Sequence, residues 1–154
     1  MDPIETLRTI ELFKSLKPQA LERVAAIASE ETHTRGTTIF RQGDVGDKLY
    51  IILEGQVRIS RQVAGMGEEA LAIFGPGQVF GEMALIDESP RSADALVHES
   101  CRLLVISKDG FDDLLFGDKE LAYEVLWSTV KMLVDRLRAT SDKVTLLGIS
   151  SKFG

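Results

Sequence analysis

Glycines punctuate the middle of the chain at short intervals, and this spacing restricts the fold more than any other feature. Between residues 36 and 107, short apolar or alternating segments are separated by glycines at positions 36, 43, 46, 55, 65, 67, 75 and 77. A period of two in such segments predicts β-strands, and the glycines predict the turns between them. Many short strands with glycine turns are typical of a β-sandwich or barrel.

The individual segments indicate where these strands lie. The segment "KLYIILEGQVRIS" (residues 48–60) contains two apolar runs and predicts a hairpin that turns at Glu54 and Gly55. Further short strands are predicted in "EALAIFGPGQVFG" (69–81), "SADALV" (92–97) and "CRLLVIS" (101–107).

Helical periodicity flanks this β region on both sides. Apolar residues in 2–30 follow a helical spacing that is broken at Pro18, which predicts two short amphipathic helices. After Ser107, "KDGFDDLLFG" (108–117) predicts a short helix, and a long helix begins near Glu120. We therefore expect one mainly β domain over residues 1–154, with helices in 1–30, a β-roll in 31–108 and helices in 109–148.

A heptad pattern runs along the last helix. Alternate spacings of four and three residues connect Tyr123, Trp127, Val130, Val134, Leu137, Ser141 and Val144. Such a seam predicts a homodimer through the C-terminal helix, in which the same helix of a second copy is the partner. The alternative is that this stripe packs on the chain's own barrel, a role for which Leu126, Leu133 and Leu137 provide an adjacent face.

Composition excludes several classes of protein. With 44% hydrophobic and 27% charged residues the chain resembles a soluble globular domain, and its net charge of −6 opposes binding to nucleic acid or anionic membranes. No apolar run approaches the length of a membrane span, and the first residues lack the basic start of a signal peptide, so we expect a cytoplasmic protein. The single cysteine, Cys101, is expected to be a reduced core residue.

The stretch "FGEMALIDESPRSADA" (residues 80–95) carries the chemistry. Gly81 allows a close backbone approach, and residues 82–86 can form one helical turn whose free N–H groups bind an anion. Arg91 and Ser92 add a guanidinium fork and a hydroxyl for the same anion, whereas the Glu82 carboxylate can only accept hydrogen bonds and suits sugar hydroxyls. These groups fit a ligand with a phosphate and a ribose. The alternative is that Glu82 pairs with Arg91 and caps the turn.

The same stretch resembles the phosphate-binding cassette of the cyclic-nucleotide-binding domain family. That cassette, here residues 80–93, combines Gly-Glu, a small apolar turn, a variable stretch and Arg-Ser/Thr-Ala. Upstream, "RGTTIFRQGDVGDKLYIILEGQVRI" (35–59) is similar to the first strands of the family. The resemblance implies a double-stranded β-helix, or jelly roll, that binds a cyclic nucleotide.

The resemblance also implies a role for each site residue. Arg91 and the backbone of Ser92 and Ala93 would hold the cyclic phosphate, and Glu82 would accept the ribose 2′-hydroxyl. The cradle would be completed by Gly81 and the N–H groups of Met83 and Ala84, and the base would be flanked by Ile59, Leu71 and Ala72.

The segment "DRLRATSDKV" (135–144) resembles the helix that closes over cAMP in the bacterial catabolite activator proteins. In that subgroup the residues corresponding to Arg136, Thr140 and Ser141 reach the nucleotide, with the serine coming from the other subunit. The heptad count independently places Ser141 on the seam. We therefore expect cAMP as the ligand, with cGMP second; a cyclic dinucleotide would need a second phosphate site.

Three other functions remain to be weighed. The activators continue into a DNA-binding helix-turn-helix, whereas "TLLGISSKFG" (145–154) is too short for one, so we expect no direct DNA binding by this chain and instead a downstream protein partner. A metal-dependent jelly-roll enzyme would need clustered ligands, but the only histidines are His33 and His98, so neither a metal nor catalysis is expected. A docking or dimerisation module that no longer binds a ligand would be expected to have lost Glu82, Arg91 or the glycines. All of these residues are present, which favours ligand binding.

Overall fold

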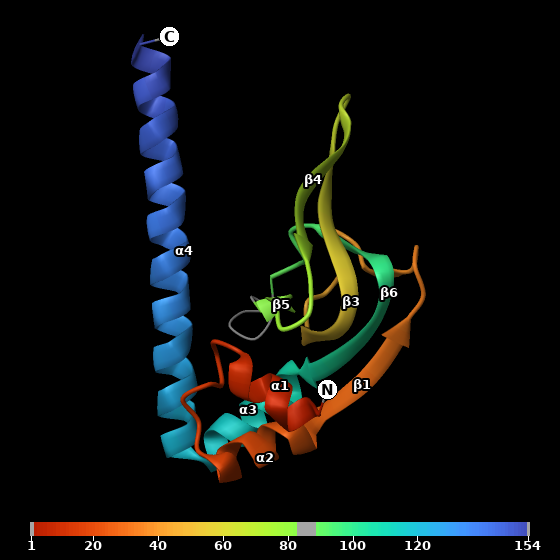
Figure 1. Cartoon of the computed structure of the whole chain (residues 1–154), viewed down its shortest axis with the longest axis vertical. Coiled ribbons are helices and arrows are strands. Elements are labelled where there is room, and N and C mark those ends of the chain that lie inside the picture. Colours follow the sequence, from red (N-terminus) through yellow and green to blue (C-terminus); the bar gives the residue numbers. More distant parts are fainter. Residues whose placement is uncertain (1, 83–88, 154) are drawn as a thin grey trace.

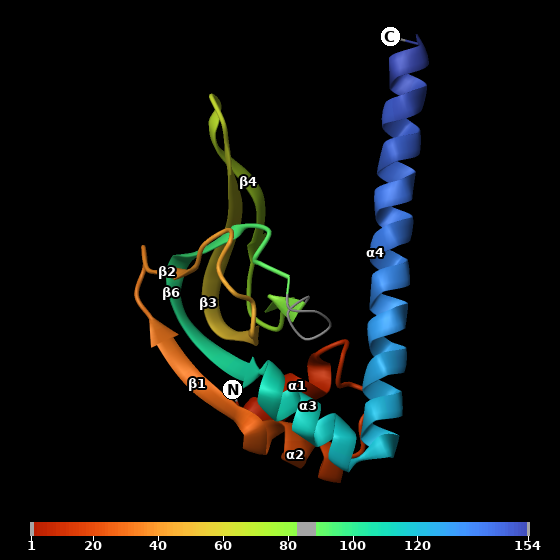
Figure 2. The ribbon, with the colours of Figure 1, turned by 180° about the vertical axis from the view of Figure 1, so that it is seen from behind.

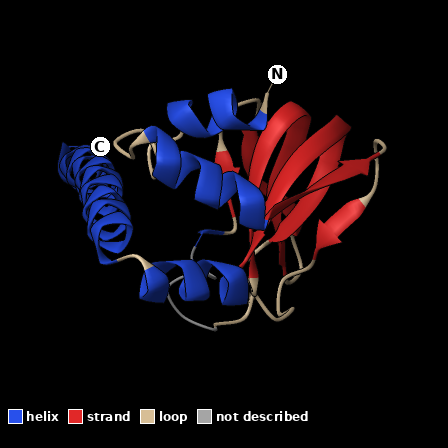
Figure 3. Cartoon of the chain, turned by 90° about the horizontal axis from the view of Figure 1, so that it is seen from below, coloured by secondary structure: helices blue, strands red, loops and turns tan. Residues whose placement is uncertain are grey.

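The computed structural model describes residues 2–82 and 89–153, with side chains up to Asp142. A rolled β-sheet forms the body, three short helices gather at one of its ends, and a long helix runs along one side (Figure 1). Seen from below, the helices lie to one side of the strands (Figure 3). The elements are α1 (Pro3–Thr9), α2 (Pro18–Ile27), β1 (Ala28–His33), β2 (Thr38–Phe40), β3 (Lys48–Val63), β4 (Gly67–Phe74), β5 (Val79–Phe80), β6 (Asp94–Ser107), α3 (Lys108–Gly117) and α4 (Lys119–Phe153).

The sheet is antiparallel throughout and is built on two long strands. Its order is β1-β6-β3-β4, with β2 pairing on β6 and β5 pairing on β3. The predicted mainly β fold with flanking helices is therefore confirmed. Strand β1 begins at Ala28, so residues 28–30, which we expected in the helical region, belong to the sheet.

The predicted hairpin at Glu54 and Gly55 is wrong, because β3 continues through both residues. The two halves of β3 pair with successive parts of β6, and the register shifts near Gly55 instead of reversing. Gly55 has φ +92°, and a Cβ added there would lie 2.3 Å from the carbonyl oxygen of Ser100. The true hairpin joins β3 to β4 beyond Val63. Likewise, β6 is one strand where two were expected.

The alternation of side chains along β3 and β6 produces two hydrophobic cores. Leu49, Ile51 and Leu53 face the helices. They form one core with buried residues of α1, α2, α3 and the start of α4. Tyr50 and Ile52 face the interior of the roll, where Cys101 is also buried. Because successive residues of a strand point to opposite faces, an almost continuous apolar run can serve both cores.

The junction between α3 and α4 is fixed to α2 by polar contacts. The Asp118 carboxylate accepts a hydrogen bond from the backbone N–H of Leu121, which caps α4, and it also pairs with Arg23 at 2.6 Å. Lys17 of the segment before α2 pairs with Glu120 at 2.7 Å. The base of α4 is therefore attached to the helical end of the domain.

Beyond its first turns, α4 stands apart from the sheet (Figure 2). Leu121 and Val125 are buried, but Leu126, Leu133 and Leu137 are 57%, 40% and 66% exposed. The alternative in which this face of α4 packs on the chain's own barrel is not found, because the three leucines are exposed; beyond its first turns α4 contacts the body through Met132 and Arg136. Among the helices as far as they are described, none has a stretch apolar and long enough to cross a membrane.

Candidate functional site

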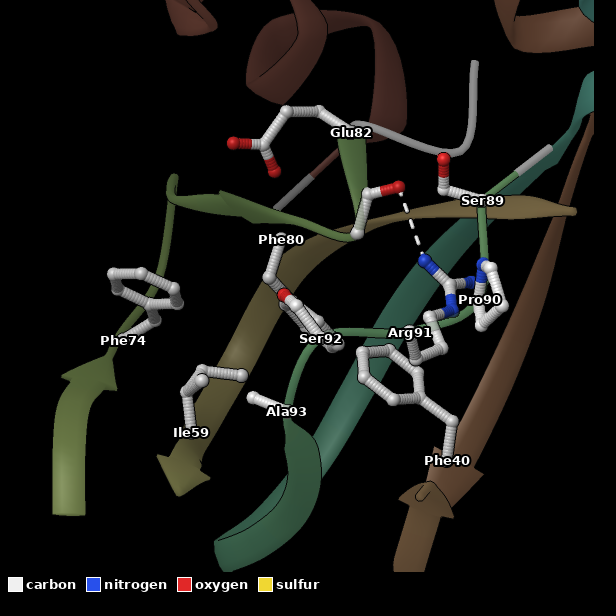
Figure 4. Close-up of a pocket in the computed structure, with 11 residues that line it drawn as sticks. Phe40, Ile59, Phe74, Phe80, Glu82, Ser89, Pro90, Arg91, Ser92 and Ala93 are labelled. Atoms are coloured by element: carbon white, nitrogen blue, oxygen red, sulfur yellow. Dashed lines mark hydrogen bonds between the residues drawn. The ribbon is translucent and has the colours of Figure 1, made fainter. Parts of the chain in front are cut away.

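A cavity of about 290 Å³ opens at one end of the roll, where β2, β3, β4, β5 and the segment just before β6 converge. Figure 4 shows its lining, with Arg91 and Phe74 on opposite sides and the Glu82 carboxylate on the rim between them. The lining residues are Phe40, Ile59, Phe74, Phe80, Gly81, Glu82, Ser89, Pro90, Arg91, Ser92 and Ala93.

The backbone of Arg91 is fixed by the loop after β2. Its N–H donates to the carbonyl of Asp44 and its carbonyl accepts from the N–H of Gly43, both at 2.8 Å. Three residues later, the buried Asp94 carboxylate accepts from the N–H of Gln42 at 2.7 Å. Two segments distant in sequence are thereby locked together, so the arginine occupies a defined position.

The side chain of Arg91 is a buried cation with an unusual environment. It is 8% exposed and donates from Nη1 to the carbonyl of Gly81 at 3.2 Å and from Nη2 to the carbonyl of Lys48 at 2.8 Å. In the described part of the chain its Nε has no hydrogen-bond partner and no carboxylate forms an ion pair with it. Burial lowers the pKa of Arg91, but a guanidinium stays charged at neutral pH.

Gly81 is required for the close approach of Arg91 to the backbone. Its φ is +75°, a region that residues with a side chain rarely adopt. A Cβ at this position would lie 2.8 Å from Nη1 of Arg91 and 3.1 Å from the carbonyl oxygen of Lys48. The glycine therefore permits the packing of the guanidinium against the carbonyl groups.

Glu82 pairs with α4 rather than with Arg91. The Glu82 side chain is 13% exposed, and its carboxylate forms an ion pair with Arg136 that links the rim of the cavity to the middle of α4. The alternative in which Glu82 pairs with Arg91 is not found in the described structure. A carboxylate at this rim can accept further hydrogen bonds from a hydroxyl group.

The structure collects some of the predicted site residues and leaves others apart. Gly81, Glu82, Arg91, Ser92, Ala93 and Ile59 line the cavity. Leu71 does not, because β4 bulges there: Ile59 pairs with Ala72 and Ser60 with Ala70, which leaves Leu71 unpaired and 45% exposed. Ala72 lies opposite Ile59 without lining the cavity.

Of the three α4 residues that the resemblance places over the nucleotide, Arg136 reaches the rim, whereas Thr140 and Ser141 do not line the cavity. Thr140 and Ser141 are exposed on α4, and the Thr140 hydroxyl donates to the carbonyl of Arg136 at 3.0 Å. Met83, Ala84 and most of the helical turn predicted for residues 82–86 lie outside the described residues.

Sequence reasoning missed the aromatic part of the lining. Phe40, Phe74 and Phe80 are the last residues of β2, β4 and β5. Each precedes a glycine-containing loop, and this repeated arrangement is the signal that could have identified them. Ser89 and Pro90 lie within the predicted cassette but were given no role there; both line the cavity next to Arg91.

The histidines do not form a metal centre. His33 contacts Glu31 at 3.2 Å, within β1. Across the ranges that the structure describes, no three His, Cys, Asp or Glu side chains gather in a way that could hold a metal ion.

Comparisons with known proteins agree with this architecture. The family profile described as "Cyclic nucleotide-binding domain" matches residues 30–118. The chain is 34% identical to the cyclic AMP receptor protein of Thermus thermophilus, over 88% of this chain and 61% of that protein, so it spans about three fifths of that relative's length.

Two solved structures extend the comparison. The N-terminal domain of a transcriptional regulator from Streptomyces coelicolor is 33% identical, with a TM-score of 0.79 over 90% of this chain and 94% of that one. The regulatory domain of Toxoplasma gondii PKA, crystallised with cAMP, is 32% identical, with a TM-score of 0.68 over 73% of this chain and 42% of that one. The chain therefore belongs to the cyclic nucleotide-binding domain family.

Proposed function

We propose that this domain is a sensor that binds a purine 3′,5′-cyclic monophosphate, with cAMP preferred over cGMP. The observation that carries the proposal is the buried Arg91 guanidinium, which borders the cavity without a carboxylate partner among the described residues. A buried cation is costly unless an anion accompanies it. A phosphate that enters the cavity would supply that anion.

The order of groups along the cavity supports a nucleotide in one orientation. Arg91 lies on one side, Glu82 on the rim and the Phe74 ring on the other side (Figure 4). A cation suits the phosphate, a carboxylate suits the ribose 2′-hydroxyl and an aromatic ring can stack on a base. The spatial order Arg91, Glu82, Phe74 along the cavity thus matches the order phosphate, ribose, base in a nucleotide.

Two further points support cAMP as the ligand. The Thermus relative is named as a cyclic AMP receptor, and the Toxoplasma domain was crystallised with cAMP. In addition, Arg91 is the sole basic residue in the described lining, which favours a ligand with one phosphate over a cyclic dinucleotide.

Calorimetric titration tests the proposal directly. We expect saturable binding of cAMP, weaker binding of cGMP, and much weaker binding of a cyclic dinucleotide and of 5′-AMP, whose open phosphate has a different shape and charge. If none of these nucleotides binds at millimolar concentration, the domain is not a nucleotide sensor.

The Glu82–Arg136 ion pair gives the ligand a route to α4. A ribose hydroxyl that donates to Glu82 changes the environment of the carboxylate that holds Arg136. Since a ligand shifts a conformational equilibrium only through contacts that differ between the two states, we propose that this exchange moves α4 and brings Thr140 and Ser141 over the base. The net charge of −6 opposes contact between this domain and nucleic acid, so we propose that it passes the signal to a protein in the cytoplasm.

Replacing Ser141 with alanine tests this closure. If the hydroxyl bonds the base, its loss should weaken cAMP binding by about two- to tenfold, the usual range for one neutral hydrogen bond, and should reduce the preference for cAMP over cGMP. Ser29→Ala, at an exposed position on β1, is the matched control. Unchanged affinity and unchanged preference in Ser141→Ala would exclude the closure.

We also propose that the functional unit is a homodimer formed through α4. The seam residues Tyr123, Trp127, Val130, Val134 and Leu137 are 40–66% exposed in the single chain, a long apolar stripe without a partner among the described residues. The side chain of Val144, at the end of the predicted seam, lies outside the described part. A second copy of α4 would cover the stripe with the same heptad spacing.

A charge in this seam should separate the subunits. Val130 is half-exposed, so Val130→Asp should leave the fold of one chain intact and convert dimers to monomers in light scattering at micromolar concentration. Ala139→Asp introduces the same charge on the same helix away from the seam and should remain dimeric. A wild-type monomer at every concentration, with or without cAMP, would contradict the proposed dimer.

A further inference from the structure

One face of the Arg91 guanidinium is covered by aromatic rings. Its Cζ lies 4.2 Å from the ring centroid of Phe40 and 5.9 Å from that of Tyr50. The Phe40 ring in turn contacts Tyr50 and Phe80, with centroids 5.9 and 6.0 Å apart, and Tyr50 stacks on Phe80 at 5.0 Å. Figure 4 shows the Phe40 ring beside the Arg91 side chain at the edge of the cavity.

The same segment positions both the ring and the arginine. Phe40 ends β2, opposite Ala95 of β6, and the loop that follows it supplies the Gly43 and Asp44 groups that hold the Arg91 backbone. The aromatic face and the guanidinium are therefore placed relative to each other by one antiparallel pairing. Such a contact is favourable because the face of an aromatic ring carries partial negative charge.

Among the described residues, an aromatic ring lies against the Arg91 guanidinium and no carboxylate forms an ion pair with it, which has a chemical consequence. A carboxylate would occupy the N–H groups of the guanidinium and compete with a phosphate for them. A ring compensates the buried charge from its face and leaves the N–H groups on the edge free of a carboxylate. Nη1 and Nη2 each donate to one backbone carbonyl, and Nε has no hydrogen-bond partner in the described structure. The Tyr50 ring also faces the guanidinium without supplying a negative charge, because burial raises the pKa of its phenol and keeps the phenol neutral.

We propose that Phe40 is a positioning residue for the phosphate site, where its ring orients and stabilises the buried Arg91 while leaving the guanidinium edge available to the ligand. This inference rests on the proposed function, since it assumes that Arg91 binds the phosphate of a cyclic nucleotide. It adds a residue from outside the cassette, 51 positions earlier in the chain, to the phosphate site.

A double-mutant cycle tests this role. In the wild-type background, Phe40→Leu should weaken cAMP binding by about 3- to 30-fold, the range expected for a desolvated cation–π contact, whereas Phe40→Tyr should retain wild-type affinity. In an Arg91→Ala background, Phe40→Leu should change the residual affinity less than about twofold, because the ring acts through the arginine. Phe116→Leu, at an 89% exposed phenylalanine on α3, is the matched control.

A spectroscopic measurement provides an independent test without nucleotide. The Nε–H resonance of Arg91 should carry a ring-current shift from Phe40; Phe40→Leu should remove this shift and Phe40→Tyr should preserve it.

The outcomes separate the two proposals. If wild-type protein binds no cyclic nucleotide, both fail. If it binds cAMP but Phe40→Leu has the same effect with and without Arg91, or Phe40→Tyr does not retain affinity, or the resonance does not move, Phe40 acts only in packing and this inference alone is overturned.

Discussion

Replacing Arg91 with alanine should weaken cAMP binding by at least about tenfold. The substitution removes the cation that we expect to hold the cyclic phosphate, and each charge-assisted hydrogen bond contributes about 1.5–3 kcal/mol, where about 1.4 kcal/mol corresponds to a factor of ten. Arg91→Lys should have an intermediate effect, because a lysine keeps the charge but not the planar fork. Titration calorimetry on the three proteins measures the series.

The controls separate lost binding from lost folding. Arg35→Ala removes the same charge from an exposed turn before β2 and should bind cAMP like the wild type. Thermal unfolding without nucleotide should show that Arg91→Ala is folded, and a given concentration of cAMP should raise the melting temperature of Arg35→Ala more than that of Arg91→Ala. Equal affinity in both variants would show that Arg91 does not hold the phosphate.

Gly55→Ala should be the most destabilising single substitution that we predict. At φ +92° a side chain is strained, and the added Cβ would lie 2.3 Å from the carbonyl oxygen of Ser100 and 2.8 Å from Cα of Cys101. Left-handed strain costs about 1–2 kcal/mol and overpacking about 1–3 kcal/mol. We therefore expect the free energy of unfolding to fall by about 2–5 kcal/mol, a large part of the stability of a typical domain.

Gly36 provides a matched control for this prediction. Its φ of +90° is almost the same, but a Cβ there would meet no atom within 4 Å. Gly36→Ala should therefore lose only the strain energy, and the difference between the two variants in urea denaturation measures the close approach of β3 to β6. If the two substitutions cost the same, the contact with Ser100 relaxes without penalty.

Periodicity identified the type of fold, but it did not identify where strands continue. The alternating residues of 48–63 correctly indicate strand, yet Gly55 resembles a turn residue in sequence and acts as an irregularity inside one long strand. Only pairing with the similarly long β6 decides between these outcomes, and such pairing is a long-range property. The helices were easier to predict because their signals are local: Pro18 begins α2 and Ser107 caps α3.

The polar part of the candidate site was predictable because its sequence signal is also local. Its polar groups, Glu82 and Arg91, lie in one continuous motif, and both line the cavity. The aromatic residues come from three separate strands, so their convergence depends on how the sheet rolls. Leu71, which the resemblance assigns to the base, does not line the cavity, because a one-residue bulge in β4 leaves it unpaired. The family is non-catalytic, which confirms the expectation that the domain is not an enzyme.

The way in which α4 is attached determines how far a small movement can reach. The helix is held at its base by Asp118 and Glu120, and Arg136 is paired with the cavity rim about halfway along its 35 residues. At 1.5 Å per residue, Arg136 lies roughly 26 Å from the start of the helix and Phe153 roughly 51 Å from it. As a rigid lever that pivots at Asp118, the helix doubles any sideways displacement of Arg136 at its far end.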